Sequence, residues 1–423
     1  MESSTEKTSM PEKLLDGMKV LSFCHYLQGP AGVQYLADMG ADVIRVEPLD
    51  GGFERRMGGP SSLPSHVSAL FIAANRNKRS IAVNLKAPEG RRIVQRLVEE
   101  YDIVVENYRH GVMERLGLAY ADLKAVQPDI IYASGSGFGA GGPMAKAPGQ
   151  DLLIQAATGL VAASGKFGAA PTAAGASVVD QHAASLLAMG ILGAFVRRLT
   201  TGRGGRVESN LFSAGIDLQM EAITFYLNRK KMPFASDLER DSHLATWFHP
   251  APYGIYRIAD GFIVLSLVSG EELHAALEDP ALAALSGLDP FDDRDRYAGI
   301  VAQVLEGFGY AEIAPRLEAK GIWFARVATY EDLETHPQVH HNRSFADIEF
   351  KHQSMRVVAH PIRYDGEVPG IRRPPPELGA NTREVLEQIG YSAGEIGDLA
   401  TRRVVFFGET AGDEESSENV EVH

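Results

Sequence analysis

The sequence predicts an α/β protein whose main domain is a Rossmann-like sheet with helices on its faces. Three observations predict this class. Short apolar runs alternate with helical patterns through residue 133, the first two runs enclose a helix in a βαβ unit, and polar residues follow the strand ends. In sheets of this kind ligands bind beyond the carboxyl ends of the strands, which is where these polar residues are expected.

The first βαβ unit has clear signals at each boundary. Residues 19–23 form an apolar run, Gly29-Pro30 opens a helix that continues to residue 39, and Pro48 stops a second strand at 43–47. A turn with three cations at 75–79 follows. The next predicted elements are a strand at 80–85, a helix at 86–100, a strand at 102–105 and a strand at 130–133.

Beyond a glycine-dense loop at 135–149, helical patterns dominate until residue 228. The charged stretch 229–241 is the predicted exit from the first domain. The expected elements are helices at 151–159, 181–199 and 211–228, a hairpin at 253–257 and 262–267, and helices at 271–278, 294–307, 310–320 and 382–399. The polar stretches 1–13 and 408–423 are predicted to be disordered.

Composition limits the possible functions. The chain has 423 residues, enough for two domains, and a net charge of −14, so a nucleic-acid-binding or anionic-membrane-binding role is not expected. Cys24 is the single cysteine, which excludes an intramolecular disulfide and fits a reducing compartment. The N-terminus is polar and lacks an apolar signal region, which predicts a cytoplasmic protein. The sequence contains no helical H-x-x-x-H pair with a supporting acid, so no metal site is predicted.

Asp180 stands out because it precedes a helix that carries no charge until Arg197. A carboxylate at a helix N-terminus accepts backbone N–H bonds and is stabilised in its ionised form. Such a carboxylate is a candidate nucleophile toward an acyl centre. The alternative is that Asp180 only caps its helix. The helix at 181–199 is expected to lie in the core, because its uncharged run is shorter than the ~20 residues of a membrane span.

Cationic and aromatic residues follow two of the predicted strands. Lys86 comes after one strand, and Asn107-Tyr108-Arg109 with Arg115 comes after the next. Together they are suited to a nucleotide with several phosphates. A nicotinamide dinucleotide is a poor fit, because the glycine fingerprint is absent and Pro30 removes an N–H from the phosphate cradle. Gln150-Asp151 opens another helix, where Asp151 is either a cap or a partner of Asp180.

Six segments in the same order resemble the class III coenzyme A transferases, the family that includes formyl-CoA and carnitine CoA transferases. They are LDGMKVLSF, QGPAGVQYLADMGADVIRVEP, NRNKRSIAVNLK, VENYRHGVMERLG, TGRGGRV and PPELGANTREVLEQIGY. The resemblance implies a Rossmann-like large domain built from both chain ends, at 14–228 and 355–405, and a smaller middle α+β domain at 242–350. It also implies an interlocked homodimer.

The resemblance assigns the aspartate nucleophile to Asp180. It implies transfer of CoA from an acyl-CoA thioester to a carboxylic acid through an aspartyl-CoA intermediate, with acyl-CoA and small carboxylic acids as substrates and no tightly bound cofactor. The positions that correspond to CoA or substrate contacts in the family are Leu27, Gln28, Val83, Lys86, Asn107, Tyr108, Arg109, Arg115, Gln150 and Asp151.

Two departures and one rival accompany this resemblance. Leu27 stands where formyl transferases carry glutamine, and Pro48 stands where they carry a cation, so formyl and oxalyl substrates are not expected. The rival is an α-methylacyl-CoA racemase, which shares the fold and uses a histidine in a G-H-D phrase. Gln150 occupies that position here and cannot act as a general base. A non-catalytic CoA-binding protein would not need an acid at position 180.

Overall fold

The computed structural model describes residues 13–57, 68–165, 169–229 and 243–408. The predicted disordered tails lie outside the described residues except for Lys13 and Gly408. The predicted exit from the first domain at 229–241 also lies outside them except for Arg229. The described residues form two compact units. Unit 1 draws on Met1–Ile154, Ala176–Leu218 and His340–His423, and unit 2 draws on Gln155–Gly175 and Gln219–Val339.

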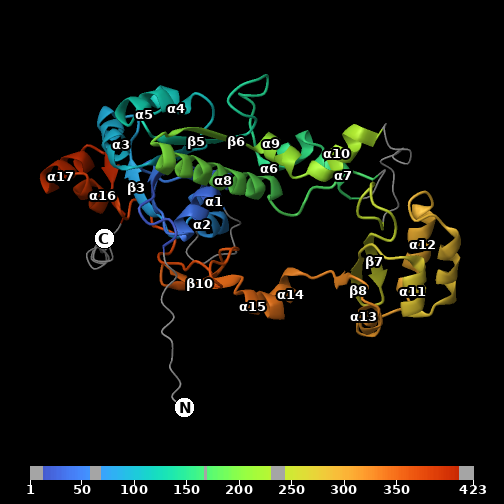
Figure 1. Ribbon diagram of the computed structural model, residues 1–423. Coiled ribbons are helices and arrows are strands. Elements are labelled where there is room, and N and C mark those ends of the chain that lie inside the picture. Colours follow the sequence, from blue (N-terminus) through green and yellow to red (C-terminus); the bar gives the residue numbers. More distant parts are fainter. Residues whose placement is uncertain (1–12, 58–67, 166–168, 230–242, 409–423) are drawn as a thin grey trace, which may run out of the picture. The chain divides into compact units, whose positions relative to one another are not determined.

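Unit 1 is built on a sheet with the strand order β12-β3-β2-β1-β4-β5-β6 (Figure 1). All neighbouring pairs are parallel except β12 and β3. The strands are β1 Lys19–Phe23, β2 Asp42–Glu47, β3 Arg79–Val83, β4 Ile103–Glu106, β5 Ile131–Ser136, β6 Gly205–Asn210 and β12 Val405–Phe406. This confirms the predicted α/β class with a large parallel sheet.

Helices cover both faces of this sheet because the buried strand residues point alternately to either side. Leu21 and Phe23 of β1 pack toward one helical layer, and Val20 packs toward the other. The first layer contains α3 Pro88–Glu100, α4 Val112–Leu116, α5 Tyr120–Val126, α16 Thr382–Gln388 and α17 Ala393–Thr401. The second contains α1 Gln28–Asp38 and α8 Val178–Thr201.

Unit 1 also holds a β-hairpin and several short helices. The hairpin buries Ile348 and Met355 against Phe71 and Ile72. These elements are η1 Phe53–Arg55, α2 Ala69–Ala74, α9 Leu211–Asp217, β10 Phe345–Phe350 and β11 Gln353–Val358. The sequence prediction placed residues up to 350 in the small domain, whereas β10 belongs to unit 1.

Unit 2 has its own core between a three-stranded antiparallel sheet and helices. Its strands are β7 Gly254–Ile258, β8 Gly261–Leu265 and β9 Phe324–Arg326. Its helices are α7 Leu160–Ala163, α10 Met220–Asn228, α11 Gly270–Leu277, η4 Pro280–Gly287, α12 Arg294–Leu305, α13 Tyr310–Ala319 and α14 Tyr330–Thr335. Helices α6 Asp151–Ala157 and α15 Pro337–Asn342 span the unit boundaries. Residues 155–175 and 219–228 belong to unit 2, although the prediction put them in the large domain.

Three predicted helices differ from the observed ones. The helix expected at 211–228 is split into α9 and α10, and the one expected at 382–399 is split into α16 and α17. Gly390 separates the latter pair with a left-handed φ of 83°, which a helix cannot contain. The helix predicted from residue 181 begins three residues earlier, at Val178.

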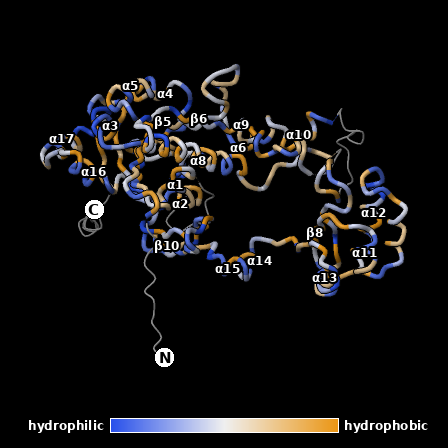
Figure 2. The backbone as a smooth tube through the Cα atoms, viewed as in Figure 1, coloured by the Kyte–Doolittle hydropathy of each residue, from blue (hydrophilic) through white to orange (hydrophobic). Residues whose placement is uncertain are grey.

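Helix α8 is the one described helix that is long and apolar enough to cross a membrane, by length and composition alone. One of its faces packs on α1 and the sheet through Ala184, Leu187 and Ile191. The burial of that face agrees with the prediction that this helix lies in the core. Figure 2 shows apolar residues around α8, and Met189, Val196 and Leu199 on its other side are 63%, 57% and 69% exposed.

Candidate active site

The sheet has its topological switch point between β1 and β4, because the chain runs outward from β1 through β2 to β3 and from β4 through β5 to β6. Ligands of open parallel sheets bind at this point, beyond the carboxyl ends of the strands. The loop after β1 leads into α1, and the loop after β4 leads into α4. Six of the predicted site residues lie in these loops or in the first turns of the helices that follow them.

Asn107 ties these two loops together. The His25 amide donates to Asn107 Oδ1 at 2.8 Å, and Asn107 Nδ2 donates to the carbonyl oxygen of His25 at 2.8 Å. The His25 ring Nε2 lies 3.2 Å from the Asn107 carbonyl oxygen. Asn107 therefore sets the distance between the two sides of the predicted CoA site.

Gln28 is buried at the start of α1 and reaches toward β5. A Cβ added at Gly135 would meet Gln28 Oε1 at 2.8 Å and Asn107 Cβ at 3.3 Å, so a larger residue there would displace the Gln28 amide. Among the described residues, no acceptor pairs with Gln28 Nε2, although this atom is buried. A buried donor without a partner is rare and points to a ligand or solvent oxygen.

The other predicted residues of the β4 loop also lie at this edge. The Tyr108 ring meets the His25 ring edge-on at 5.1 Å, and burial raises the pKa of Tyr108 to about 12. Arg109 is exposed. Arg115 is exposed in α4, with Nη1 3.2 Å from the position of a Cβ at Gly111. Both cations are thus accessible to an anionic ligand.

The two predicted residues at β3 differ in accessibility. The Val83 side chain is buried in the core, and its backbone pairs with Val405 of β12, so the side chain itself is not available to a ligand. Lys86 is exposed beyond the end of β3. Since β3 and β4 are three strand spacings apart, their ends are about 14 Å apart. A ligand that reaches both Lys86 and Arg115 must be long.

The structure brings Asp151 and Asp180 together. Asp151 Oδ1 accepts hydrogen bonds from the amides of Val179 at 2.8 Å and of Asp180 at 2.9 Å. The buried Asp151 side chain thereby caps α8 from outside the helix. Gln150, the residue before it, is exposed.

The predicted capping role of Asp180 is therefore wrong. Asp180 is the third residue of α8, and no described residue donates a hydrogen bond to its carboxylate. The expectation that it stays readily ionised is also wrong, because burial and then the charge of Asp151 raise the pKa of Asp180 to about 7. A poorly solvated carboxylate with a raised pKa is a stronger nucleophile once it is ionised.

The first amides of α8 are all engaged. Besides the two that bond to Asp151, the Val178 amide donates to the Ala176 carbonyl at 2.8 Å and the Gln181 amide donates to Ser177 at 3.1 Å. They are not free to stabilise an oxyanion. The unpaired Nε2 of Gln28 is a donor that the sequence did not single out for this role.

Leu27 joins α1 to α8 and lies in one apolar cluster with Ala31 and Ala184. Ala184 is one helical turn beyond Asp180 on the same face of α8, a step of about 6 Å along the axis. Leu27 therefore lies beside the face of α8 that carries Asp180.

Two groups at this edge escaped the sequence analysis. Tyr26 and Phe53 form an exposed ring pair. The signal in the sequence was an aromatic residue in the loop that follows a strand. Glu106 at the end of β4 is buried, and burial raises its pKa to about 7. Among the described residues, no group of three His, Cys, Asp or Glu side chains is placed to hold a metal ion.

The sequence matches the family described as CoA-transferase family III over residues 15–382. The chain belongs to this family. An acyl-CoA transferase of Fusarium pseudograminearum is 31% identical, with 93% of this chain and 89% of the relative covered. A succinyl-CoA:glutarate CoA-transferase of Mus musculus is 29% identical, with 93% and 90% covered.

The fold of this CoA-transferase also matches solved structures. A CAIB/BAIF family protein from Brucella suis superposes with a TM-score of 0.76 at 26% identity, covering 90% of this chain and 99% of that chain. The family that the six sequence segments predicted is thus confirmed, as is an α/β fold with a large parallel sheet. The roles of the individual site residues remain predictions.

The exposed cations of this CoA-transferase give the first prediction. We expect Lys86→Ala and Arg115→Ala each to raise the KM for acyl-CoA about fivefold to tenfold with a smaller fall in kcat, because both would bind phosphate equally in the ground and transition states. Steady-state kinetics against acyl-CoA measure this. Lys320→Ala, an exposed lysine of unit 2, is the control. An unchanged KM in both variants would remove these residues from the site.

Proposed function

We propose that this enzyme transfers coenzyme A from an acyl-CoA thioester to a carboxylic acid, with Asp180 as the nucleophile. The arrangement of Asp151 and Asp180 supports this most directly. Asp151 occupies the N–H groups of Val179 and Asp180, so that the half-buried Asp180 carboxylate is left without a hydrogen-bond donor among the described residues. A carboxylate that only capped a helix would make those bonds itself.

The proposed reaction conserves the thioester. Asp180 attacks the acyl carbon and expels the CoA thiolate, which leaves a mixed anhydride. The thiolate then attacks the aspartyl carbonyl, releases the first acid and forms an aspartyl-CoA thioester. An acceptor carboxylate attacks that thioester and expels the thiolate, which leaves a second mixed anhydride. The thiolate then attacks the acyl carbon of the acceptor, which forms the new acyl-CoA and restores the Asp180 carboxylate. No water enters any step, so the site must exclude it.

Each tetrahedral intermediate places negative charge on an oxygen, and Gln28 Nε2 is proposed as one donor to it. We expect Gln28→Met to lower kcat/KM on the order of 10²-fold, because the volume is kept and the donor is lost. The free energy of unfolding should not fall, since the variant removes a buried donor that has no partner in the described residues. A loss of activity that only accompanies a loss of stability would assign Gln28 a structural role.

The rival racemase needs a general base at position 150. Gln150 has no titratable group, so no proton-transfer pair is present there. The comparisons likewise favour the transferase, because the relatives described above are named as transferases.

We also propose that the enzyme is a homodimer. The apolar residues Met189, Val196 and Leu199 on the outer side of α8 are largely exposed, and such a row is usually covered in an assembly. Val196→Glu should lower the mass measured by light scattering if α8 lies in the interface.

Trapping the intermediate tests the proposed reaction. The enzyme is incubated with an acyl-CoA and hydroxylamine, and the peptide that contains Asp180 is analysed by mass spectrometry. An aspartyl hydroxamate at position 180 is the expected product, because hydroxylamine captures both the anhydride and the aspartyl thioester. A set of acyl-CoA esters and carboxylates is screened for new thioesters in parallel. Turnover without the adduct at position 180 would contradict the nucleophile.

A further inference from the structure

Four aromatic rings form a row across the carboxyl ends of β2, β1 and β4. Phe53 lies 6.1 Å from Tyr26, Tyr26 lies 4.9 Å from His25, and His25 lies 5.1 Å from Tyr108, measured between ring centroids. The His25 and Tyr108 end is half-buried, whereas Tyr26 and Phe53 are 44% and 56% exposed. We call Tyr26 and Phe53 the aromatic shelf.

The backbone at Tyr26 is strained. Its φ of 59° lies in the left-handed region, which a bulky residue other than glycine rarely adopts. Such a conformation is energetically unfavourable and is found mainly at ligand-binding and catalytic positions. The strain turns the chain between His25 and Leu27, so that Tyr26 joins the ring row while Leu27 packs on α8.

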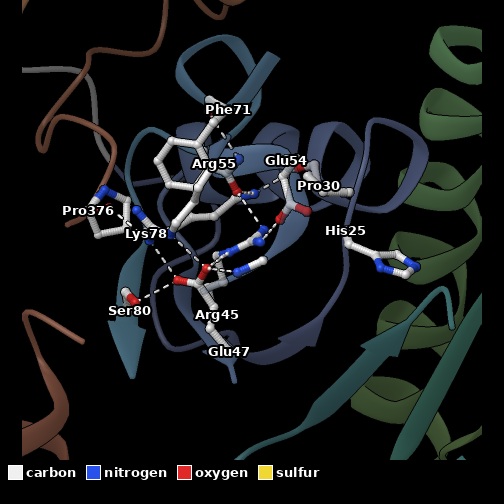
Figure 3. A network of polar contacts seen from close by, with 12 residues as sticks. His25, Pro30, Arg45, Glu47, Glu54, Arg55, Phe71, Lys78, Ser80 and Pro376 are labelled. Atoms are coloured by element: carbon white, nitrogen blue, oxygen red, sulfur yellow. Dashed lines mark hydrogen bonds and ion pairs between the residues drawn. The ribbon is translucent and has the colours of Figure 1, made fainter. Parts of the chain in front are cut away.

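A buried ion network fixes the loop that carries Phe53 (Figure 3). Arg55 donates to Glu47 at 2.6 and 2.8 Å, and its guanidinium lies 4.0 Å from the centroid of the Phe71 ring. Arg45 bonds to Glu54 and lies 3.1 Å from Glu47. Although burial opposes ionisation, Arg45 and Arg55 hold the pKa of Glu47 down, to about 2.

This network leaves its own charges unavailable to a substrate. Both arginines are paired with carboxylates, and the buried Lys78 donates to the Pro30 and Ala74 carbonyls and to Asn75 Oδ1 at 2.7 to 3.0 Å. The exposed cation of the Phe53 loop is Arg56, which donates from Nη1 to the Asp50 carbonyl at 2.9 Å. What the shelf itself presents is apolar ring surface.

The shelf is connected to the helix of the proposed nucleophile through Leu27. Tyr26 is next to Leu27, which packs on Ala184, one turn of α8 from Asp180. The other end of the ring row meets Tyr108, beside the predicted contacts of the CoA arm. A thioester held at Asp180 therefore has apolar surface on the side of Leu27 and Tyr26.

We propose that the aromatic shelf of Tyr26 and Phe53 binds the acyl group, so that the preferred substrates carry a flat or branched apolar acyl group. This inference rests on the proposed transferase reaction. Ring surface gains free energy from contact with such a group and none from a second carboxylate, which needs a cation. The proposed preference for an apolar acyl group distinguishes this enzyme from the Mus musculus relative, whose name gives dicarboxylates as substrates.

The test measures isotope exchange between an acid and its own CoA ester, which requires no knowledge of the natural acceptor. Phenylacetyl-, isovaleryl-, acetyl- and succinyl-CoA are each incubated with the matching labelled acid. The wild type should exchange phenylacetate or isovalerate at least tenfold faster than succinate. Tyr26→Asn, which tolerates the left-handed conformation, and Phe53→Ala should each lose about tenfold in kcat/KM for phenylacetyl-CoA and about twofold for acetyl-CoA. Tyr330→Ala, an exposed tyrosine of unit 2, is the matched control.

Three results would overturn the inference. An equal loss for all esters would place the shelf on the CoA arm. Preference for succinyl-CoA, abolished by Arg56→Ala, would show a carboxylate subsite. A lowered oligomer mass in Tyr26→Asn or Phe53→Ala would show an interface between copies. Formation of a hydroxamate at Asp180 with any ester would show that the transferase mechanism operates. Each of the three results would then contradict only the role of the shelf and not the mechanism.

Discussion

We expect Asp180→Asn to lower kcat for CoA transfer on the order of 10³-fold or more, because an amide cannot attack the thioester. Binding of acyl-CoA persists, since Asp180 is not among the cationic or aromatic groups of the predicted CoA contacts. The measurement is transfer activity together with equilibrium binding of a slowly reacting acyl-CoA. If Asp180 only supported the fold, the near-isosteric Asn would retain most of the activity.

The same variant changes stability in a direction that a structural residue would not show. The folded-state pKa of about 7 lies above the ordinary value of 3.8, so the folded protein loses stability as pH rises between these values and carries the full penalty above pH 7. At pH 8, the free energy of unfolding of Asp180→Asn should therefore exceed that of the wild type by roughly 1–3 kcal/mol. The variant should accordingly unfold at a higher temperature. The difference should vanish near pH 4. Asp180→Ala repeats the kinetic test without the risk of deamidation.

Removing the charge of Asp151 shifts the pH dependence of the reaction. In the wild type, kcat/KM should fall about tenfold per pH unit below pH 7, because protonated Asp180 cannot act as a nucleophile. Asp151→Asn keeps an oxygen for the amides of Val179 and Asp180 but removes the nearby negative charge. The midpoint of the acid limb should therefore move to lower pH. The measurement is a pH profile of kcat/KM from pH 5 to 9.

Asp151→Ala is the control for this result. It removes the cap as well as the charge and should cost about 0.5–2 kcal/mol of stability. Asp151→Asn should cost less. If the acid limb stays at the same pH in both variants, another group controls it, and Glu106, whose pKa burial raises to about 7, is the first candidate.

The fold followed from the sequence to the extent that local patterns determine it. The parallel strands β1 to β4 are short apolar runs bounded by proline, glycine or polar residues, and each was predicted within a few residues. The antiparallel edge strand β12 was not, because Val405 and Phe406 gain their strand geometry from pairing with residues far away in sequence. The break between α9 and α10 also lacked a glycine or proline to mark it.

The sequence named candidate site residues but did not predict the electrostatics around them. Sequence position marked Asp180 and Asp151, yet the bond from the Asp180 amide to Asp151 spans 29 residues and depends on where α6 begins relative to α8. For the same reason the pKa of Asp180 was misjudged. The turn expected before the strand is present, with Arg76 and Lys78 ahead of β3 and Arg79 as its first residue. The sequence did not show that these cations are buried among acceptors drawn from α1, α2 and the C-terminal segment.

The return of the chain to the first sheet imposes an order on folding during synthesis. Residues 370–406 supply the partners of β3 and of the Asn77 side chain, whose Oδ1 accepts from the amides of Arg372 and Arg373. Until the ribosome has released these last residues, β3 is an open edge and Arg79 lacks its partner Glu384. The edge of β3 therefore stays unpaired while residues 219–339 of unit 2 are translated. An unpaired strand edge can pair with another chain, so aggregation of the nascent chain is favoured during this interval.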